Sequence, residues 1–252
     1  MVLLSFLVVT GCSRRDILDD YPVSGVEVRL DWSGVTEKLP EGVRIIFYPK
    51  DEKGRKIDTY LSVTGGEVKV PSGHYAVVIY NYDTETVLIR GEESYETIQA
   101  YTNFCKLGIA GTEKMVWGPD PLYVVNIDDL DIQNSEETLI LKLKPKLVIR
   151  TYSFSIKVQG LSNVSNVIGS IGGMAHHYFL GKAYAMCDDY PINIDLNVKA
   201  GKIEGVFTTF GLPEAIITRL EIKLPVMMNL MIIKVDNSVQ EVKINITEAV
   251  QE

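Results

Sequence analysis

A serine flanked by glycines is the first place where this sequence could carry out chemistry. The segment Gly169–Gly172 reads GSIG and is similar to the G-x-S-x-G turn that presents a nucleophilic serine in many hydrolases. That motif needs a glycine at position 168, where this chain has isoleucine, and no strand–turn–helix pattern surrounds it. We therefore interpret the segment as a glycine-softened turn.

Histidines and aspartates could bind a metal ion. His176 and His177 are adjacent in a predicted strand, where neighbouring side chains point to opposite faces, so we expect that they do not chelate together. The third histidine, His74, is distant, and no Cys-x-x-Cys motif accompanies it. The acidic segment Asp128–Asp131 lacks the glycine of a calcium loop, which favours a solvated loop. The sequence therefore predicts no metal site.

Two pairs of adjacent acids, Glu92-Glu93 and Asp188-Asp189, complete the residues that could act in catalysis. Adjacency in a loop says nothing about the separation of two carboxylates that glycoside hydrolysis requires. The glycines of the chain match no nucleotide-binding loop. We therefore predict no catalytic residues and no cofactor, and we expect a protein that is not an enzyme.

A cysteine near the start of the chain carries the strongest chemical signal. Residues 2–9 form an apolar run that is too short to span a membrane and is typical of a signal peptide. The segment Val9–Cys12 reads VTGC and matches a lipobox, which predicts cleavage between Gly11 and Cys12 and acylation of the Cys12 thiol. No lysine or arginine precedes Val2, so we expect the natural start further upstream. The alternative, a buried apolar strand, is disfavoured by the polar segment that follows at once.

The composition describes a globular, acidic chain. Of 252 residues, 46% are hydrophobic and 23% are charged, and 25 lysines and arginines against 33 aspartates and glutamates give a net charge of −8. Phosphate binding needs clustered basic residues, which this sequence lacks, so we expect no nucleic-acid partner. The longest other apolar stretch, Leu224–Val235, contains a proline and an asparagine. We therefore expect acyl chains on Cys12 to be the only membrane attachment.

The elements that must position these residues are strands. Val26–Trp32 alternates apolar and polar residues without error, and short segments of the same kind recur between turn residues, which predicts β-sandwiches. The best candidate for a helix is the short segment Pro213–Thr218. The predicted strands are Val26–Trp32, Val43–Tyr48, Thr59–Val63, Glu67–Val70, His74–Tyr80, Val87–Arg90, Leu122–Ile127, Thr138–Leu143, Lys146–Val158, Val164–Ile171, His176–Lys182, Ile192–Val198, Lys202–Thr209, Leu220–Leu224, Met227–Val235 and Val239–Ile246.

A proline marks the predicted boundary between two domains. Pro145 interrupts a long alternating stretch, and proline cannot donate a hydrogen bond to a central strand. We expect a signal peptide at 1–11, a tether at 12–24, and sandwiches at 25–144 and 145–252. Cys105 and Cys187 then lie in different domains, and both a disulfide and two separate thiols remain open.

The chain resembles a known group of surface proteins. Gly66–Asn81 reads GEVKVPSGHYAVVIYN and is similar to the G-x-V-x-L-P-x-G-x-Y-x-V signature of transthyretin-like sandwiches. With the lipobox, the chain resembles the Bacteroidales fimbrial-anchor (FimB-like) lipoprotein superfamily. Arg90–Thr97 and Thr208–Gly211 look closest to a related lipoprotein family of unknown function.

The resemblance implies a fold and a function. The fold is all-β, with two tandem transthyretin-like, Greek-key β-sandwiches. The function is that of a lipid-anchored structural protein at the outer membrane and cell surface, an anchor or base subunit of a fimbria. Its partners would be other fimbrial subunits, bound by β-strand augmentation. The alternative is a surface lipoprotein that binds glycan or host protein, for which Trp117, predicted to lie exposed in a turn, is the first contact candidate.

Overall fold

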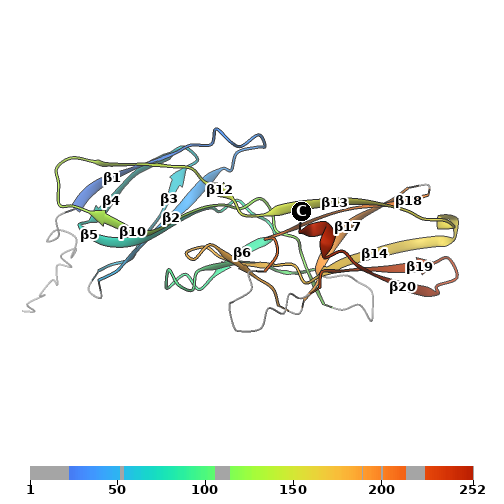
Figure 1. The fold of residues 1–252 in the computed structure, drawn as a ribbon. Helices are drawn as coiled ribbons and strands as arrows, with labels where there is room; N and C mark the ends of the chain where they lie inside the picture. Colours follow the sequence, from blue (N-terminus) through green and yellow to red (C-terminus); the bar gives the residue numbers. More distant parts are fainter. Residues whose placement is uncertain are drawn as a thin grey trace, which may run out of the picture.

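The computed structural model describes residues 23–51, 54–105, 114–188, 190–199, 201–213 and 225–251. Within these ranges the chain folds into β-strands and two short 3-10 helices, η2 (Leu161–Asn163) and η3 (Glu248–Val250) (Figure 1). No helix of these ranges has the length and apolar character needed to span a membrane. The predicted elements Pro213–Thr218 and Leu220–Leu224 fall wholly or mostly outside the described residues.

The first half, together with β12 just after Pro145, forms one curled sheet of eight strands. Its order is β11-β1-β4-β3-β2-β5-β10-β12, and all of its neighbours are antiparallel except β1 and β11. The sheet folds over a core that includes Trp32, Phe47 and Tyr75. The strands are β1 (Val23–Leu30), β2 (Gly42–Pro49), β3 (Ile57–Ser62), β4 (Gly65–Pro71), β5 (Gly73–Asn81), β10 (Tyr123–Ile132), β11 (Leu139–Leu143) and β12 (Lys146–Leu147).

The second half forms a six-stranded curled sheet with the order β13-β18-β17-β14-β19-β20. Its strands surround a core that includes Ile171, Ile192 and Phe207. Two short strands of the first half join it, because β9 pairs parallel with β17 and β8 pairs with β9. The strands are β8 (Phe104–Cys105), β9 (Met115–Val116), β13 (Arg150–Lys157), β14 (Val164–Gly172), β17 (Ile192–Lys199), β18 (Lys202–Thr209), β19 (Met227–Lys234) and β20 (Val239–Asn245).

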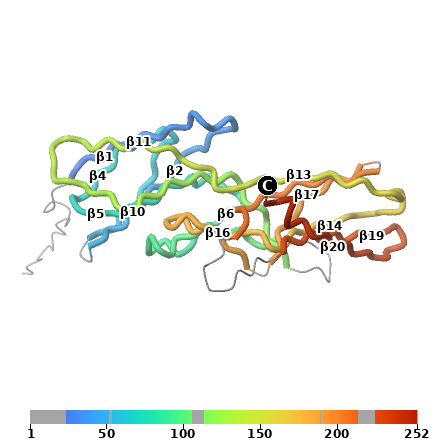
Figure 2. The backbone as a smooth tube through the Cα atoms, viewed as in Figure 1, coloured from blue at the N-terminus to red at the C-terminus, as the bar shows by residue number. Residues whose placement is uncertain are grey.

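A third sheet of four strands is built from both halves of the chain. Its order is β16-β15-β7-β6, with β6 (Val87–Arg90) and β7 (Gln99–Thr102) from the first half and β15 (His177–Phe179) and β16 (Tyr184–Met186) from the second. It lies in the middle of the molecule, between the two larger sheets, as the green and orange segments of Figure 2 show. Strand pairing therefore crosses the predicted boundary near Pro145, which itself lies between β11 and β12.

The strands β2 and β5 are covered on both faces. Ile45 and Phe47 point into the core of the first sandwich, whereas Ile46 and Tyr48 point into a second cluster shared with the four-stranded sheet. This second cluster includes residues of both halves, among them Val78, Ile98, Leu122, Ala175, Leu180 and Phe210. Continuous apolar runs are expected where a strand is buried on both sides. The predicted all-β fold with two tandem sandwiches is confirmed, and a shared core joins them.

Candidate interaction surfaces

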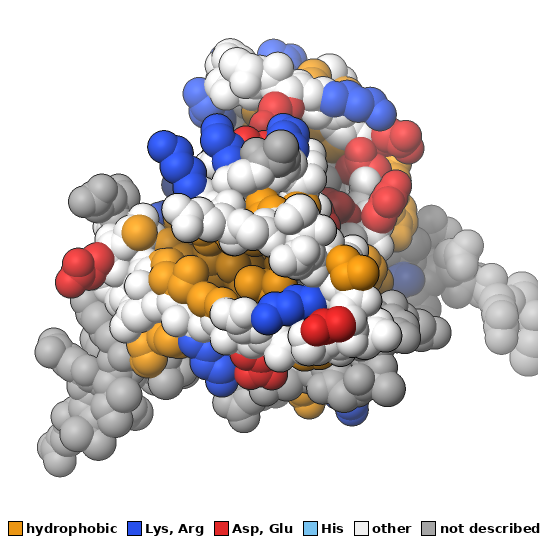
Figure 3. Space-filling view, turned by 90° about the vertical axis from the view of Figure 1, so that its right-hand side faces the viewer, with side chains coloured by type: hydrophobic (Ala, Val, Ile, Leu, Met, Phe, Trp, Pro, Cys, Tyr) orange, Lys and Arg blue, Asp and Glu red, His pale blue; other side chains and the backbone are white. Residues whose placement is uncertain are grey.

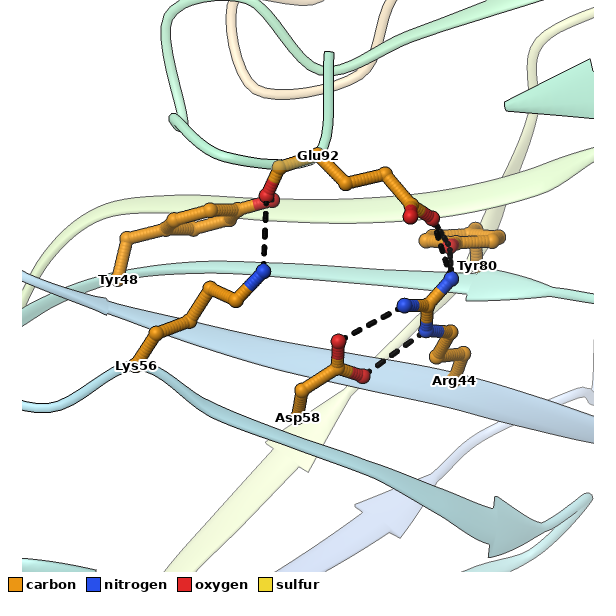
Figure 4. A network of polar contacts seen from close by, with 6 residues as sticks. All are labelled: Arg44, Tyr48, Lys56, Asp58, Tyr80 and Glu92. Carbon is orange, nitrogen blue, oxygen red and sulfur yellow. Dashed lines mark hydrogen bonds and ion pairs between the residues drawn. The ribbon is translucent and has the colours of Figure 1, made fainter. Parts of the chain in front are cut away.

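A network of polar side chains holds a loop of the middle sheet against the first sandwich (Figure 4). Arg44 of β2 donates to both carboxylate oxygens of Asp58 at 2.9 and 2.8 Å and to the Tyr80 hydroxyl at 2.9 Å. It also forms an ion pair with Glu92, which follows β6. The hydrogen bonds to Asp58 raise the pKa of the Arg44 guanidinium despite the partial burial, so this group stays charged.

The backbone of Glu92 is fixed as firmly as its side chain. Its carbonyl oxygen accepts hydrogen bonds from the Tyr48 hydroxyl and the Lys56 ammonium, both at 3.1 Å (Figure 4). Burial raises the pKa of the Tyr48 hydroxyl, which therefore remains a hydrogen-bond donor at neutral pH. The network thus fixes the loop after β6 of the middle sheet on the first sandwich.

A groove of about 650 Å³ lies beside this network and contains charges of both signs. Two of its charged side chains have partners: Lys182 Nζ lies 2.7 Å from Glu96, and the Tyr95 hydroxyl donates to Asp128 at 2.8 Å. The loop after β6 is thus packed against the first sandwich. The sequence did not indicate this contact, because Glu92 and Glu93 were visible there only as two adjacent acidic residues.

The structure brings the two adjacent histidines together. The ring centroids of His176 and His177 are 4.3 Å apart, and His177 Nε2 lies 2.8 Å from Asp188 Oδ2. The expectation that they point to opposite faces was wrong, because β15 begins at His177 and His176 lies in the irregular segment before it. Burial is the main cause that lowers both imidazole pKa values, that of His176 to about 4, so both rings are neutral at pH 7.

The serine and the cysteines considered in the sequence analysis do not form a common site among the described residues. Ser170 is buried in the centre of β14, paired with Asn193 and Asn229, so it is not at a strand–helix turn. Cys105 and Cys187 form no disulfide with each other. Gly11 and Cys12 lie outside the described residues, so acylation stays a prediction.

Trp117 directly follows β9, and 38% of its side chain is exposed. Its backbone N–H donates to the carbonyl of Asn103 at 2.9 Å, which holds it beside β8. The exposure agrees with the sequence-based expectation. Its role as a contact for a ligand stays a prediction.

The sheet of the second sandwich ends in two edge strands. Its edge strands β13 and β20 have no partner strand on their outer sides within the described residues. The inward side chains of these two strands pack against the core but are only partly buried; they are Tyr152, Phe154, Ile156, Val242 and Ile244. Figure 3 shows hydrophobic side chains gathered in a hollow at this end of the molecule. We call the two free edges of this sheet, β13 and β20, the open seam.

Gly205 on the neighbouring strand β18 leaves space for the side chain of Phe154 on β13. A Cβ atom at Gly205 of β18 would lie only 2.3 Å from Cζ of the Phe154 ring, so only glycine leaves space for this ring. The Phe154 ring therefore lies over the core while part of it faces solvent. In strand addition generally, an exposed sheet edge supplies main-chain hydrogen bonds and pockets for alternate side chains.

Comparison with known proteins identifies the family. A model of the family described as "Domain of unknown function (DUF5119)" matches residues 11–195. The chain belongs to this family. A relative from Bacteroides ovatus is named "Putative fimbrium anchoring subunit Fim4B". The two proteins are 52% identical over an alignment of 261 residues, which covers 99% of this chain and 78% of that protein.

Solved structures are similar to this DUF5119 chain as well. One, described as a "putative adhesin" from Bacteroides ovatus, shares 52% identity, with a TM-score of 0.86 over 96% of this chain and 89% of that one. The fimbrial anchor protein Mfa2 from Porphyromonas gingivalis has 15% identity and a TM-score of 0.55, covering 91% and 84% of the two chains. The Mfa2 comparison shows a shared fold.

Proposed function

We propose that this chain is the lipid-anchored anchoring subunit of a cell-surface fimbria, a structural role without catalysis. The observation that carries the proposal is the 52% identity, over 99% of this chain, to a protein named as a fimbrium anchoring subunit. That identity extends over almost the whole of this chain and 78% of the relative. The comparison therefore supports the function of the relative for this chain.

The proposed anchor is the acylated Cys12. Only residues 13–22 separate it from Val23, where β1 begins, so at most about 40 Å of extended chain connects the lipid to the first sandwich. β1 begins at the end of the molecule opposite the second sandwich (Figure 1). A bilayer at Cys12 would therefore leave the open seam directed away from the membrane, toward the rest of a filament.

The proposed contact with the filament is an extended segment of another fimbrial subunit, added in the open seam. The backbone groups on the outer sides of β13 and β20 would supply the hydrogen bonds. Alternate side chains of the added strand would cover Phe154 and Ile244, which are partly buried before any partner binds. Burial of apolar area contributes roughly 25 cal/mol per Å², so an apolar, alternating segment is the expected occupant.

The test is co-purification of fimbrial subunits with variants of the seam. Ile244→Asp places a charge between the added strand and the core, and we expect at least a tenfold loss of bound fimbrial subunits. The matched control is Val239→Asp in the same strand, at a side chain that is already 56% exposed. Thermal unfolding of each purified variant verifies that it is folded. Equal recovery of fimbrial subunits with a folded Ile244→Asp variant would exclude the seam as the binding site.

A further inference from the structure

Three metal-ligating side chains meet at the edge of the middle sheet, away from the open seam. His177 begins β15 and pairs with Met186 of β16, and Asp188 follows β16 by two residues. Strand pairing therefore brings Asp188 back to His177. One ligand atom each from His176, His177 and Asp188 lie within 4.8 Å of one another.

His176 is the unusual member of this group. Its side chain is 2% exposed, and neither Nδ1 nor Nε2 has a hydrogen-bond partner among the described residues. Burying a polar group without a partner costs free energy, so buried ring nitrogens are normally paired. The ring is tilted by 47° against the His177 ring, whose Nε2 faces Asp188. A cation held among the three groups would give His176 the partner that the protein does not supply.

We propose that His176, His177 and Asp188 bind one zinc ion, with water as the fourth ligand. Two imidazole nitrogens and one carboxylate oxygen are a donor set typical of zinc, whereas calcium and magnesium prefer oxygen ligands. Asp188 is 52% exposed on its side chain, so the cation enters, and the water binds, from this side. This inference is independent of the proposed fimbrial function.

The spacing of the three groups needs a small adjustment. Ligand atoms at about 2.0–2.1 Å from a tetrahedral zinc ion are roughly 3.3 Å apart, closer than the widest separation present here. His177 Nε2 and Asp188 Oδ2, at 2.8 Å, are closer than this spacing and have to separate slightly. Asp188 can move most easily, because its side chain is the exposed member and lies beyond the end of β16.

The positive charge of Arg90 lies close to His177 and repels a bound cation. Its Nη2 lies 3.3 Å from His177 Nδ1 and 3.1 Å from Gln99 Oε1, and its guanidinium lies over the Tyr101 ring. When His177 Nε2 binds zinc, the ring hydrogen resides on Nδ1, so Arg90 loses this contact and keeps Gln99 and Tyr101. Replacing Arg90 therefore removes both a positive charge and a competing donor.

The test is titration of the untagged full-length protein with Zn²⁺ by isothermal calorimetry, after removal of metals with a chelator. We expect one Zn²⁺ per chain and no heat of binding with Mg²⁺ or Ca²⁺. His177→Ala abolishes binding, and Asp188→Asn weakens it at least tenfold. Arg90→Met binds more tightly than the natural chain. The matched control, His74→Ala, removes the exposed histidine of the first sandwich and leaves binding unchanged.

A second measurement keeps the proposal falsifiable if His177→Ala does not fold. Zinc X-ray absorption on the loaded natural protein is expected to show two imidazole ligands and only nitrogen and oxygen donors. No binding by the natural chain, equal affinity in Asp188→Asn, a sulfur ligand, or loss of binding in His74→Ala would each overturn the assignment.

Discussion

Single residues define how the middle sheet is held on the first sandwich. Glu92 contacts Arg44 through its carboxylate and Tyr48 through its backbone carbonyl. This single residue of the loop that follows β6 therefore fixes the loop on the first sandwich. The signal in the sequence was Arg44, a charge inside the apolar strand segment GVRIIFYP. A half-buried arginine in such a strand requires an acidic partner, but the sequence does not say which acid returns to it. Asp58 and Glu92 are 14 and 48 residues away.

Glu92→Gln is expected to lower the free energy of unfolding by about 1–2 kcal/mol, because it removes a charge-assisted hydrogen bond at a partly exposed site. The measurement is urea unfolding at pH 7. Glu93→Gln changes the exposed neighbour and is expected to alter the free energy by less than about 0.5 kcal/mol. Equal stability of the two variants would show that the charge of Glu92 contributes nothing to stability.

At the scale of elements, most strands follow from the pattern of apolar residues. β1, β2, β5 and β18 lie within a few residues of the predicted ranges, since alternation or a long apolar run specifies a strand with a buried face. The short strands β7, β8, β9 and β16 were not predicted. They have two to four residues, too few for a period to show. Two of them, β7 and β9, also have partners in the second half of the chain, β15 and β17.

The two covered faces of β2 lead to a direct prediction. Ile45→Ala and Ile46→Ala each leave a cavity in a different core, and each is expected to cost about 2–5 kcal/mol of the free energy of unfolding. A strand with one solvated face would tolerate one of the two changes. Val198→Ala, at a side chain that is 44% exposed, is the control and is expected to cost less than about 0.5 kcal/mol. Denaturant unfolding distinguishes these cases.

At the scale of the whole molecule, the two sandwiches are joined by the shared cluster and the four-stranded sheet. The sequence predicted two sandwiches, and the proline near their boundary was visible. It did not predict that β7, which pairs with β6, also pairs with β15 of the second half, because pairing between distant segments leaves no periodic signal. The molecule therefore consists of two sandwiches that share one interior.

The shared interior predicts that the second half does not fold by itself. A chain of residues 145–252 lacks β6 and β7 and exposes Ala175, Leu180 and Phe210, which are fully or almost fully buried in the whole chain. We expect poor dispersion in its nuclear magnetic resonance spectrum and no cooperative thermal transition, in contrast to residues 23–252. A dispersed spectrum with a cooperative transition would show that the halves are independent.

The most direct test of the proposed function is the distribution of fimbriae between cells and medium when Cys12→Ser replaces the natural chain. We expect filaments to assemble and most fimbrial subunits to appear in the medium, because the proposed lipid attachment is lost. Cys105→Ser, a change at a buried thiol, is the matched control and is expected to keep fimbriae on the cells. Fimbriae that stay attached to cells carrying Cys12→Ser, in the amount seen with the natural chain, would contradict the proposal.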